Sequence, residues 1–418
     1  LGFANSMAAA ATGCFATVAM DLPTHGLDAS TTDRNGAATR YSAFNAFNVA
    51  GYVLPPLDPN NAATTPTPFA ATLAGLAAAE VTTYAGLAER HENLALNAAQ
   101  QAVAMNFVAG EESGNSGDMF INLTNMQQTR DHIRQAVMDM LNLNASIANM
   151  DIDGAGAGDL DEDNIHFVGH SLGAITGLTY SAVNNAVANN AAITDKAVNA
   201  LKTVVLANPG GQLPKLLENS PSFSAKILPG LAAAAGLTQG MTDLEKFFGV
   251  FQAPLDSADP VNFTDLLKST NTPVLMFEMV GGGLVDQTTD DMNPNDADPA
   301  TTGLPDTLIA AGGYPADTVV PNNANPALNS VATGLSYLAG TDPLVSQLEL
   351  ATVTGSIAPD TANLMVVSKL KEGTHGTISS GDAVTVFAEM IGQTASFFAT
   401  AGKGLTVNDA DQLQVPAE

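Results

Sequence analysis

The chain carries four short runs of mostly apolar residues, each long enough for a β-strand. They lie at 164–169 (NIHFVG), 203–208 (TVVLAN), 273–281 (PVLMFEMVG) and 363–370 (NLMVVSKL). Strands that are apolar along their whole length, rather than at every second position, are typical of parallel sheets covered on both faces. The four runs therefore predict a buried, mostly parallel sheet.

Segments with helical character lie between or after these runs, most clearly at 172–188 and 381–402. Strands that alternate with helices indicate an α/β fold with a doubly wound sheet. No internal repeat of fixed period is visible, which argues against a solenoid or a propeller. A chain of 418 residues is long enough to bury a large core as one domain with insertions.

The N-terminal part predicts a helix followed by a strand. Residues 1–13 are rich in helix formers and end on glycine, and residues 14–23 (CFATVAMDLP) have the composition of a buried strand. Residues 121–145 carry apolar side chains at helical spacing, with Thr124 or Asn125 as the N-cap. We expect that helix to pack on the sheet.

Three segments are predicted as insertions into this pattern. Residues 27–118 lack strand-like runs and contain proline and alanine-rich stretches, so we expect a helical and irregular insertion. Residues 211–265 contain apolar and amphipathic pieces, which favour a lid or cap that could contact a lipid interface. The alternative is that they form ordinary helices packed on the core. Residues 284–314 predict an acidic surface loop.

The charge balance argues against a nucleic-acid partner. The chain has 14 Lys and Arg against 42 Asp and Glu, a formal net charge of −28. Such a charge repels phosphate backbones, so we expect no nucleic-acid partner. An acidic surface also suits high salt, where screening weakens self-repulsion, and predicts halotolerance.

Cysteine content and hydropathy set further limits. Cys14 is the only cysteine, so no intrachain disulfide and no multi-thiolate metal site can form. No apolar run is long enough for a transmembrane segment. The chain begins at Leu1 without an initiator methionine or a signal-peptide pattern, which we interpret as a processed or partial chain.

Residues 169–173 read GHSLG, which matches the pattern G-x-S-x-G. In that pattern a serine occupies a sharp turn between a strand and a helix, so that its hydroxyl stands clear of the sheet. The predicted strand before it and the predicted helix after it provide the required context. We therefore predict that Ser171 is a nucleophile and that the two glycines relieve crowding in the turn.

A serine hydroxyl is a weak nucleophile near neutral pH and needs a base, and imidazole is the suitable side chain. Chains with this serine turn carry the nucleophile, the acid and the histidine in that order. His375 is the only one of six histidines that follows Ser171, so it is the predicted base. His166 and His170 are interpreted as packing residues, and His25 as a turn residue.

The acid that orients the histidine should follow the strand at 273–281. Asp317 and Asp286 both do. We favour Asp317, because an apolar pair and a proline follow it and would anchor its loop; Asp286 is the alternative acid. The backbone N–H of Leu172 is the predicted first oxyanion donor, and the second is expected upstream of Leu1.

Residues 151–162 (DIDGAGAGDLDE) resemble a calcium-binding loop in spacing. The predicted ligands are Asp151, Asp153, Asp159 and Glu162. Ala155 stands where a further oxygen ligand belongs, which weakens the candidate Ca²⁺ site. An acidic, glycine-rich turn without an ion is the favoured alternative.

Four stretches in this order resemble the extracellular lipases of marine bacteria, within the α/β-hydrolase superfamily. They are FANSMAAAATGCFATVAMDLPTHG, FINLTNMQQTRDHIRQAV, the acidic DxDG stretch and HFVGHSLG. The resemblance implies hydrolysis of carboxylic esters, including lipids, by Ser171, Asp317 and His375, and a secreted or cell-surface location. The chain departs from that family at Ala155 and at the missing oxyanion strand.

The sequence thus predicts a serine lipase or esterase that forms an acyl-enzyme on lipid or other hydrophobic esters, synthetic polyesters included, and requires no organic cofactor. Acyltransferase and thioesterase action would use the same triad. The alternative from another class is a non-catalytic, surface-binding protein on a degenerate hydrolase scaffold. The oligomeric state is not predicted.

Overall fold

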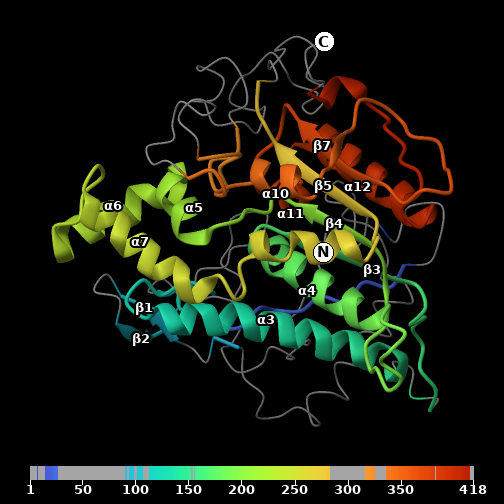
Figure 1. Cartoon of the computed structure of the whole chain (residues 1–418), viewed down its shortest axis with the longest axis horizontal. Coiled ribbons are helices and arrows are strands. Elements are labelled where there is room, and N and C mark those ends of the chain that lie inside the picture. The colour runs from blue at the N-terminus through green and yellow to red at the C-terminus, as the bar shows by residue number, and fades with distance from the viewer. Residues whose placement is uncertain are drawn as a thin grey trace, which may run out of the picture. The chain divides into compact units, whose positions relative to one another are not determined.

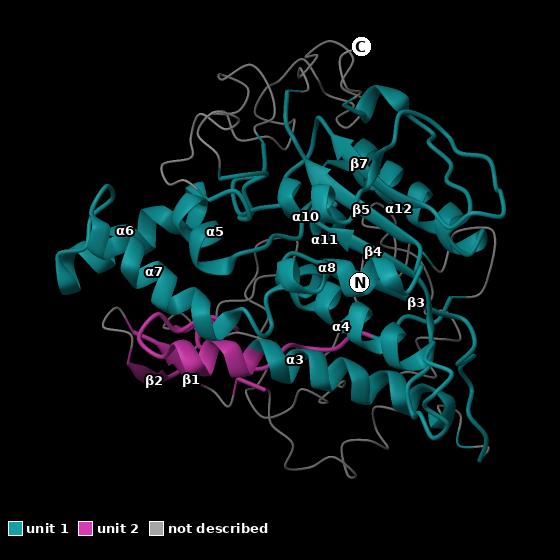
Figure 2. Cartoon of the chain, viewed as in Figure 1, with its two compact units in different colours: residues 1–18, 133–418 teal, residues 19–132 magenta. Residues whose placement is uncertain are grey.

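The computed structural model describes part of the chain (Figure 1). The described residues are 7, 15–26, 90–91, 94–97, 101–106, 113–151, 154, 156–282, 316–324, 336–381 and 383–414. They belong to two compact units, one of residues 1–18 and 133–418 and one of residues 19–132 (Figure 2). The predicted helix at 1–13, apart from the helical Met7, and the predicted loop at 284–314 lie outside the described residues.

The larger unit is built on a five-stranded parallel sheet. Its strands are β3 (Ile165–His170), β4 (Leu201–Ala207), β5 (Val274–Met279), β6 (Ala351–Thr352) and β7 (Met365–Leu370). The strand order is β3-β4-β5-β7-β6, and every neighbouring pair is parallel. The four predicted strands are confirmed as β3, β4, β5 and β7, whereas β6 was not predicted because two residues give no readable pattern.

Helices cover both faces of this sheet. Phe167 of β3 lies against helix α4 (Leu172–Ala188), so close that a Cβ on Gly177 would come within 2.4 Å of its ring. The adjacent His166 stacks on Phe398 of helix α12 (Val384–Ala399), with 4.3 Å between ring centroids. Successive residues of a strand point to opposite faces, so α4 and α12 lie on opposite sides of the sheet. This arrangement is an α/β fold, as the alternating pattern predicted.

Apolar burial explains why β5 runs through the middle of the sheet. All six residues of β5 are buried, and five of them are apolar. Burying a Val, Leu, Phe or Met side chain contributes roughly 1.5–3 kcal/mol. The α12 face of the sheet carries the main core cluster, which includes Val205, Leu275, Phe277, Val366, Leu370, Val386, Met390 and Phe397.

Residues 211–265 contain a run of helices between β4 and β5. These helices are α5 (Leu213–Asn219), α6 (Pro221–Ala235), α7 (Thr242–Leu255), η3 (Pro260–Asn262) and the beginning of α8 (Thr264–Ser269). The buried carboxylate of Asp259 accepts hydrogen bonds from the N–H groups of Gln212 (3.0 Å) and Leu213 (3.2 Å), which fixes the start of α5.

The remaining helices that the structure describes in the larger unit are short. They are η2 (Ile147–Asn149), α10 (Asp342–Gln347), α11 (Thr377–Ser380) and η5 (Ala410–Gln412). Across the described ranges, no helix combines the length and the apolarity needed to cross a membrane.

The smaller unit corrects the prediction that 27–118 lacks strands. Strands β1 (Leu94–Leu96) and β2 (Ala102–Ala104) pair antiparallel. Three-residue strands rich in alanine are held by backbone hydrogen bonds and leave no alternating apolar pattern to read. Helix α3 (Met126–Ser146) begins in this unit, and its N-cap is Asn125, whose Oδ1 accepts from the Gln128 N–H at 3.1 Å.

The predicted strand at 14–23 is wrong over the part that the structure describes. Residues 15–22 form no strand, and each is at least partly exposed. Val18, for example, has 45% of its surface exposed. The run has a strand-like composition, but it lacks the cover on both faces that a buried parallel strand requires.

Candidate active site

Ser171 occupies a strained turn between strand β3 and helix α4. Its backbone angles are φ 53° and ψ −122°, and positive φ is uncommon in residues other than glycine. Such a conformation costs about 1–3 kcal/mol and persists only where neighbouring contacts hold it. The Ser171 N–H donates to the Ala207 carbonyl at 2.9 Å, and the Ser171 carbonyl accepts from Ala174 at 2.8 Å. The strain marks Ser171 as a candidate nucleophile.

The two glycines of the GHSLG turn are not equivalent. A Cβ on Gly169 would lie 2.5 Å from the Gly173 carbonyl oxygen and 2.9 Å from Ala174 Cα, distances that a real side chain cannot adopt. A Cβ on Gly173 would meet nothing within 4 Å outside its own helix. Glycine is thus required at position 169. The expectation that a side chain at either glycine would crowd the turn is wrong for position 173.

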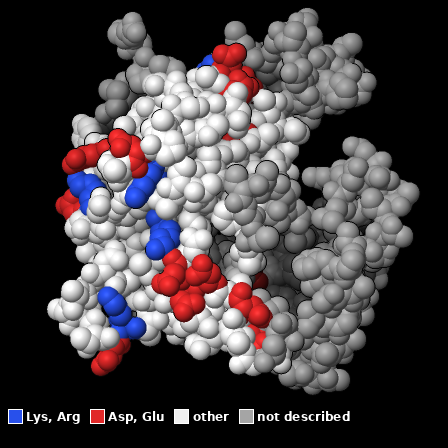
Figure 3. Space-filling view, turned by 90° about the vertical axis from the view of Figure 1, so that its right-hand side faces the viewer, with Lys and Arg blue, Asp and Glu red and all other residues white. Residues whose placement is uncertain are grey.

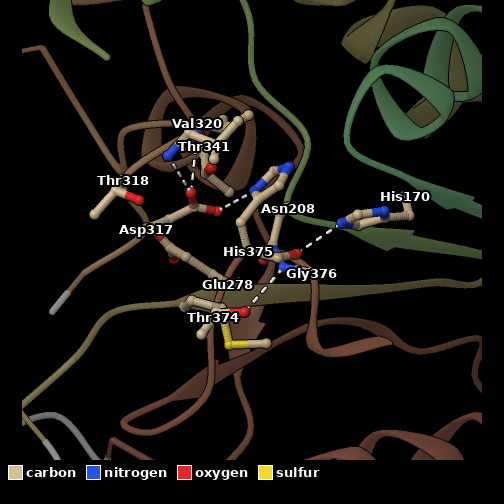
Figure 4. A network of polar contacts seen from close by, with 12 residues as sticks. His170, Asn208, Glu278, Asp317, Thr318, Val320, Thr341, Thr374, His375 and Gly376 are labelled. Carbon is tan, nitrogen blue, oxygen red and sulfur yellow. Dashed lines mark hydrogen bonds and ion pairs between the residues drawn. The ribbon is translucent and has the colours of Figure 1, made fainter. Parts of the chain in front are cut away.

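His375 and Asp317 form a close pair at the carboxyl ends of two strands (Figure 4). His375 lies in the loop after β7, and its Nδ1 is 2.6 Å from Asp317 Oδ2. The other carboxylate oxygen of Asp317 accepts from the N–H groups of Val319 (2.8 Å) and Val320 (2.9 Å). The Asp317 N–H donates to Met279, the last residue of β5, at 3.0 Å. The acid thus lies directly beyond the end of β5.

Burial strengthens this pair. The side chain of Asp317 is 2% exposed and that of His375 is 12% exposed. A carboxylate held by two N–H donors and shielded from water can orient an imidazole and stabilise its cationic form. Asp286, the alternative acid, lies outside the described residues.

The serine turn contacts the histidine loop through His170. His170 Nε2 is 2.7 Å from the carbonyl oxygen of His375, and the two imidazole rings are 4.9 Å apart between centroids. Because Ser171 directly follows His170, the predicted nucleophile is one residue from a side chain that touches the predicted base. Within the described part of the chain, His375 Nε2 is buried and has no hydrogen-bond partner. The interpretation of His170 as a packing residue is therefore incomplete.

Leu172, the predicted first oxyanion donor, directly follows Ser171. Leu172 is the first residue of α4, and the N–H groups of the first helical turn have no partner within the helix. A backbone N–H beside the nucleophile can stabilise negative charge on a substrate oxygen.

An ionic cluster around the buried Glu278 contacts the acid loop and was not predicted from the sequence. Glu278 of β5 pairs across the sheet with Lys369 of β7 at 3.0 Å, and Lys369 also contacts Asp342 at 2.7 Å. Asn322 donates to Glu278 Oε1 at 2.8 Å and to the Met279 carbonyl at 3.1 Å. Burial raises the pKa of Glu278 to about 7, and the nearby Asp342 adds to the rise. The sequence does contain a signal for this cluster, because Glu278 is a charged residue within an otherwise apolar strand run.

Helix α6 of the insertion begins against the acid loop. The Ser222 N–H donates to the Thr318 carbonyl at 2.9 Å, and the Ser220 hydroxyl donates to the same oxygen at 3.3 Å. Thr318 directly follows Asp317, so the start of α6 is hydrogen-bonded to the residue next to the predicted acid. The insertion also exposes large apolar side chains, namely Phe223 (36%), Met241 (42%) and Val250 (62%).

Two other histidines have contacts of their own. His166 is 2.7 Å from Thr203 Oγ1, and burial, with a smaller contribution from Lys202, lowers its pKa to about 4. These contacts agree with a packing role. In the smaller unit, His25 Nδ1 is 2.9 Å from the Pro23 carbonyl oxygen, which fits the predicted turn role.

The candidate calcium ligands are only partly described. Asp151 Oδ2 accepts from the Gly156 N–H at 2.7 Å, a contact within the loop. Asp153 lies outside the described residues. Among the residues with described positions, no three acidic, histidine or cysteine side chains are grouped as a metal site.

Several lysine side chains form ion pairs with acidic side chains. Lys215, Lys246 and Lys268 each lie within ion-pair distance of an Asp or Glu. On the face drawn in Figure 3, the described Lys and Arg side chains lie beside acidic ones and form no continuous basic patch.

A scan against protein-family models and searches of curated proteins and of solved structures each gave no match to this chain. Function must therefore be inferred from the chemistry of the site.

Proposed function

We propose that this protein is a serine carboxylester hydrolase in which Ser171, His375 and Asp317 act as nucleophile, base and acid. The observation that carries the proposal is the buried 2.6 Å contact between His375 and Asp317, in a loop that contacts His170, the residue before a serine with φ 53°. Strain at one residue and a shielded acid–imidazole pair beside it are expected for nucleophilic catalysis.

In the proposed reaction His375 Nε2 takes the proton of the Ser171 hydroxyl as the serine oxygen attacks an ester carbonyl. The carbonyl oxygen becomes an oxyanion, to which the Leu172 N–H donates. Collapse of this intermediate releases the alcohol, which receives the proton from His375, and leaves an acyl-enzyme. Water then loses a proton to His375, attacks the acyl-enzyme and releases the acid, restoring the serine. Asp317 holds the imidazole tautomer that leaves Nε2 free to accept a proton.

Hydrophobic esters are the proposed substrate class, and lipids are included. Phe223 of α6 is partly exposed, and Ser220 and Ser222 beside it contact Thr318, the residue after Asp317, which supports an apolar side chain near the acid loop. The resemblance to extracellular lipases of marine bacteria supports the same class and a secreted or cell-surface location. Synthetic polyesters, whose ester bonds are also flanked by apolar groups, belong to the substrates to be tested.

The test combines turnover and covalent labelling. Purified protein would be assayed with chromogenic esters of increasing acyl length and labelled with an organophosphonate, with mass spectrometry to locate the adduct. We expect labelling at Ser171 and a loss of turnover of about 10⁴-fold or more in Ser171→Ala, because triad residues act as a unit. Ser346→Ala, at an exposed serine of α10, is the matched control. Unchanged turnover in Ser171→Ala would reject the proposal.

A further inference from the structure

The carbonyl oxygen of His375 accepts two side-chain hydrogen bonds. His170 Nε2 lies 2.7 Å from it and Asn208 Nδ2 lies 2.9 Å from it. A carbonyl oxygen has two lone pairs, so these donors use its full capacity. His170 ends β3 and Asn208 follows β4, and these strands are neighbours in the sheet (Figure 4).

The first donor, His170, is fixed by its surroundings. Its ring packs against the ring of His375 at an interplanar angle of 44°. Burial lowers the pKa of His170, and the nearby His375 lowers it further, which favours the neutral ring. A neutral imidazole has a single N–H, and that proton must be on Nε2 to reach the carbonyl oxygen.

The second donor, Asn208, is fixed through its backbone. Its φ is 50°, in the left-handed region that asparagine tolerates better than most residues. Its N–H donates to the Phe277 carbonyl of β5 at 2.9 Å, which ties the residue to a third strand. The side-chain amide is thereby aimed at the His375 loop from a rigid part of the sheet.

We propose that His170 and Asn208 are positioning residues that hold the backbone of His375 at the serine turn. The proposal rests on the proposed function, because it assigns a task in bringing the base to the nucleophile. His170 is bonded in sequence to Ser171, so its side chain couples the two loops directly. Removing a donor leaves a buried carbonyl under-satisfied and frees the His375 loop to shift. A displacement of about 1 Å can cost about 10²-fold in rate.

Four variants separate positioning from packing. His170→Phe keeps a ring and removes the donor, whereas His170→Gln keeps a donor near the Nε2 position and removes the ring. Asn208→Asp keeps the size and the tolerance for positive φ and removes the donor when ionised. His166→Gln is the matched control, since His166 is the other imidazole of β3 and contacts Thr203 and Phe398 rather than His375.

The kinetic readout is the division of the effect between kcat and KM in folded variants. We expect kcat to fall about 10²-fold in His170→Phe and Asn208→Asp with little change in KM, and the rate of phosphonate labelling to fall in parallel. His170→Gln should recover most of the loss, and His166→Gln should retain the wild-type kcat. Wild-type kcat and labelling rates in both His170→Phe and Asn208→Asp would overturn the proposal.

A spectroscopic readout does not depend on ester turnover. The proton between His375 Nδ1 and Asp317 should give a downfield ¹H NMR resonance, assigned by its absence in His375→Gln. We expect it in the wild type, His170→Gln and His166→Gln, and expect it to broaden or disappear in the double variant His170→Phe/Asn208→Asp. An unchanged resonance in the double variant overturns the proposal. Failure of the wild type to turn over esters or to be labelled rejects the hydrolase function alone, and this resonance then decides the role of His170 and Asn208.

Discussion

His375 Nδ1 lies 2.6 Å from Asp317 Oδ2, although 58 residues separate the two side chains in sequence. The acid is anchored beyond β5 and the histidine follows β7, and these two strands are direct neighbours in the sheet. Parallel strands bring their carboxyl ends to one edge, where loops far apart in sequence meet. The strand order therefore creates the acid–base pair, and the backbone hydrogen bond from Asp317 to Met279 returns the acid to the end of β5.

We expect Asp317→Asn to lower kcat by about 10⁴-fold while the protein stays folded. The amide oxygen can still accept from the N–H groups of Val319 and Val320, so the loop should keep its shape. The amide, however, no longer stabilises the imidazolium or selects the tautomer that leaves Nε2 free. Steady-state kinetics with a chromogenic ester, together with circular dichroism of the variant, checks this expectation.

Asp286→Asn provides the matched control for that experiment, because Asp286 is the other candidate acid that the sequence offers. Its kcat should equal that of the wild type. A large loss in Asp286→Asn combined with near-normal turnover in Asp317→Asn would show that the acid has been assigned to the wrong residue.

Gly169→Ala should destabilise the protein and Gly173→Ala should not. The new methyl group at 169 would lie 2.5 Å from the Gly173 carbonyl oxygen, so the turn must move, and forced overpacking costs about 1–3 kcal/mol. At 173 the methyl group meets open space on a helix, where alanine is favoured over glycine by up to about 1 kcal/mol. Urea unfolding of both variants measures the difference. Equal destabilisation would contradict this account of the turn.

Much of the fold could be predicted because buried parallel strands have a simple signature. The runs that became β3, β4, β5 and β7 are apolar on both faces, and helix α4 was predicted with its observed bounds. The same signature failed at 14–23, where an apolar run lies partly exposed. The composition of a run shows how much apolar surface a strand could bury. It does not show whether neighbouring elements cover that surface.

Only the parts of the site that follow from the serine motif and from the order of the catalytic residues along the chain could be predicted. The serine turn identified Ser171, and elimination left His375. The valine pair after Asp317 favoured that loop, and the structure adds that the valine N–H groups hold the carboxylate. The bonds of His170 and Asn208 to one carbonyl oxygen depend on which strands are adjacent, and a single sequence does not reveal that.

The pairing of Glu278 with Lys369 was hidden for the same reason, and it predicts an unusual dependence of stability on pH. The folded-state pKa of Glu278 is about 7, above its ordinary value of 4.5. Between these values the folded protein holds a proton that the unfolded chain loses, so this group lowers the free energy of unfolding as pH rises. Glu278→Gln should remove that loss, a difference of at most about 3.5 kcal/mol at about 1.4 kcal/mol per pKa unit.

Chemical unfolding of Glu278→Gln and of the wild type between about pH 4 and pH 8 measures this effect. The stability of the variant relative to the wild type should rise through the window and level off above about pH 7. Glu349→Gln is the control, because Glu349 is exposed and its pKa is lowered by the hydrogen bond from Lys268. It should show no such rise. A flat difference for Glu278→Gln would mean that Glu278 is ionised throughout.

His166 should produce the opposite slope over an overlapping range of pH. Its folded-state pKa is about 4, below the ordinary value of 6.5, because the ring is buried between Thr203 and Phe398. The unfolded chain binds the proton first as pH falls, so the stabilising contribution is complete above about pH 6.5 and is lost toward pH 4. His166→Gln should reduce this loss of stability toward pH 4 by up to about 3.5 kcal/mol. Glu278 and His166 contribute opposite slopes between about pH 4.5 and 6.5, so each single variant should expose the slope of the other. A double variant that retains either slope would assign the effect to a different group.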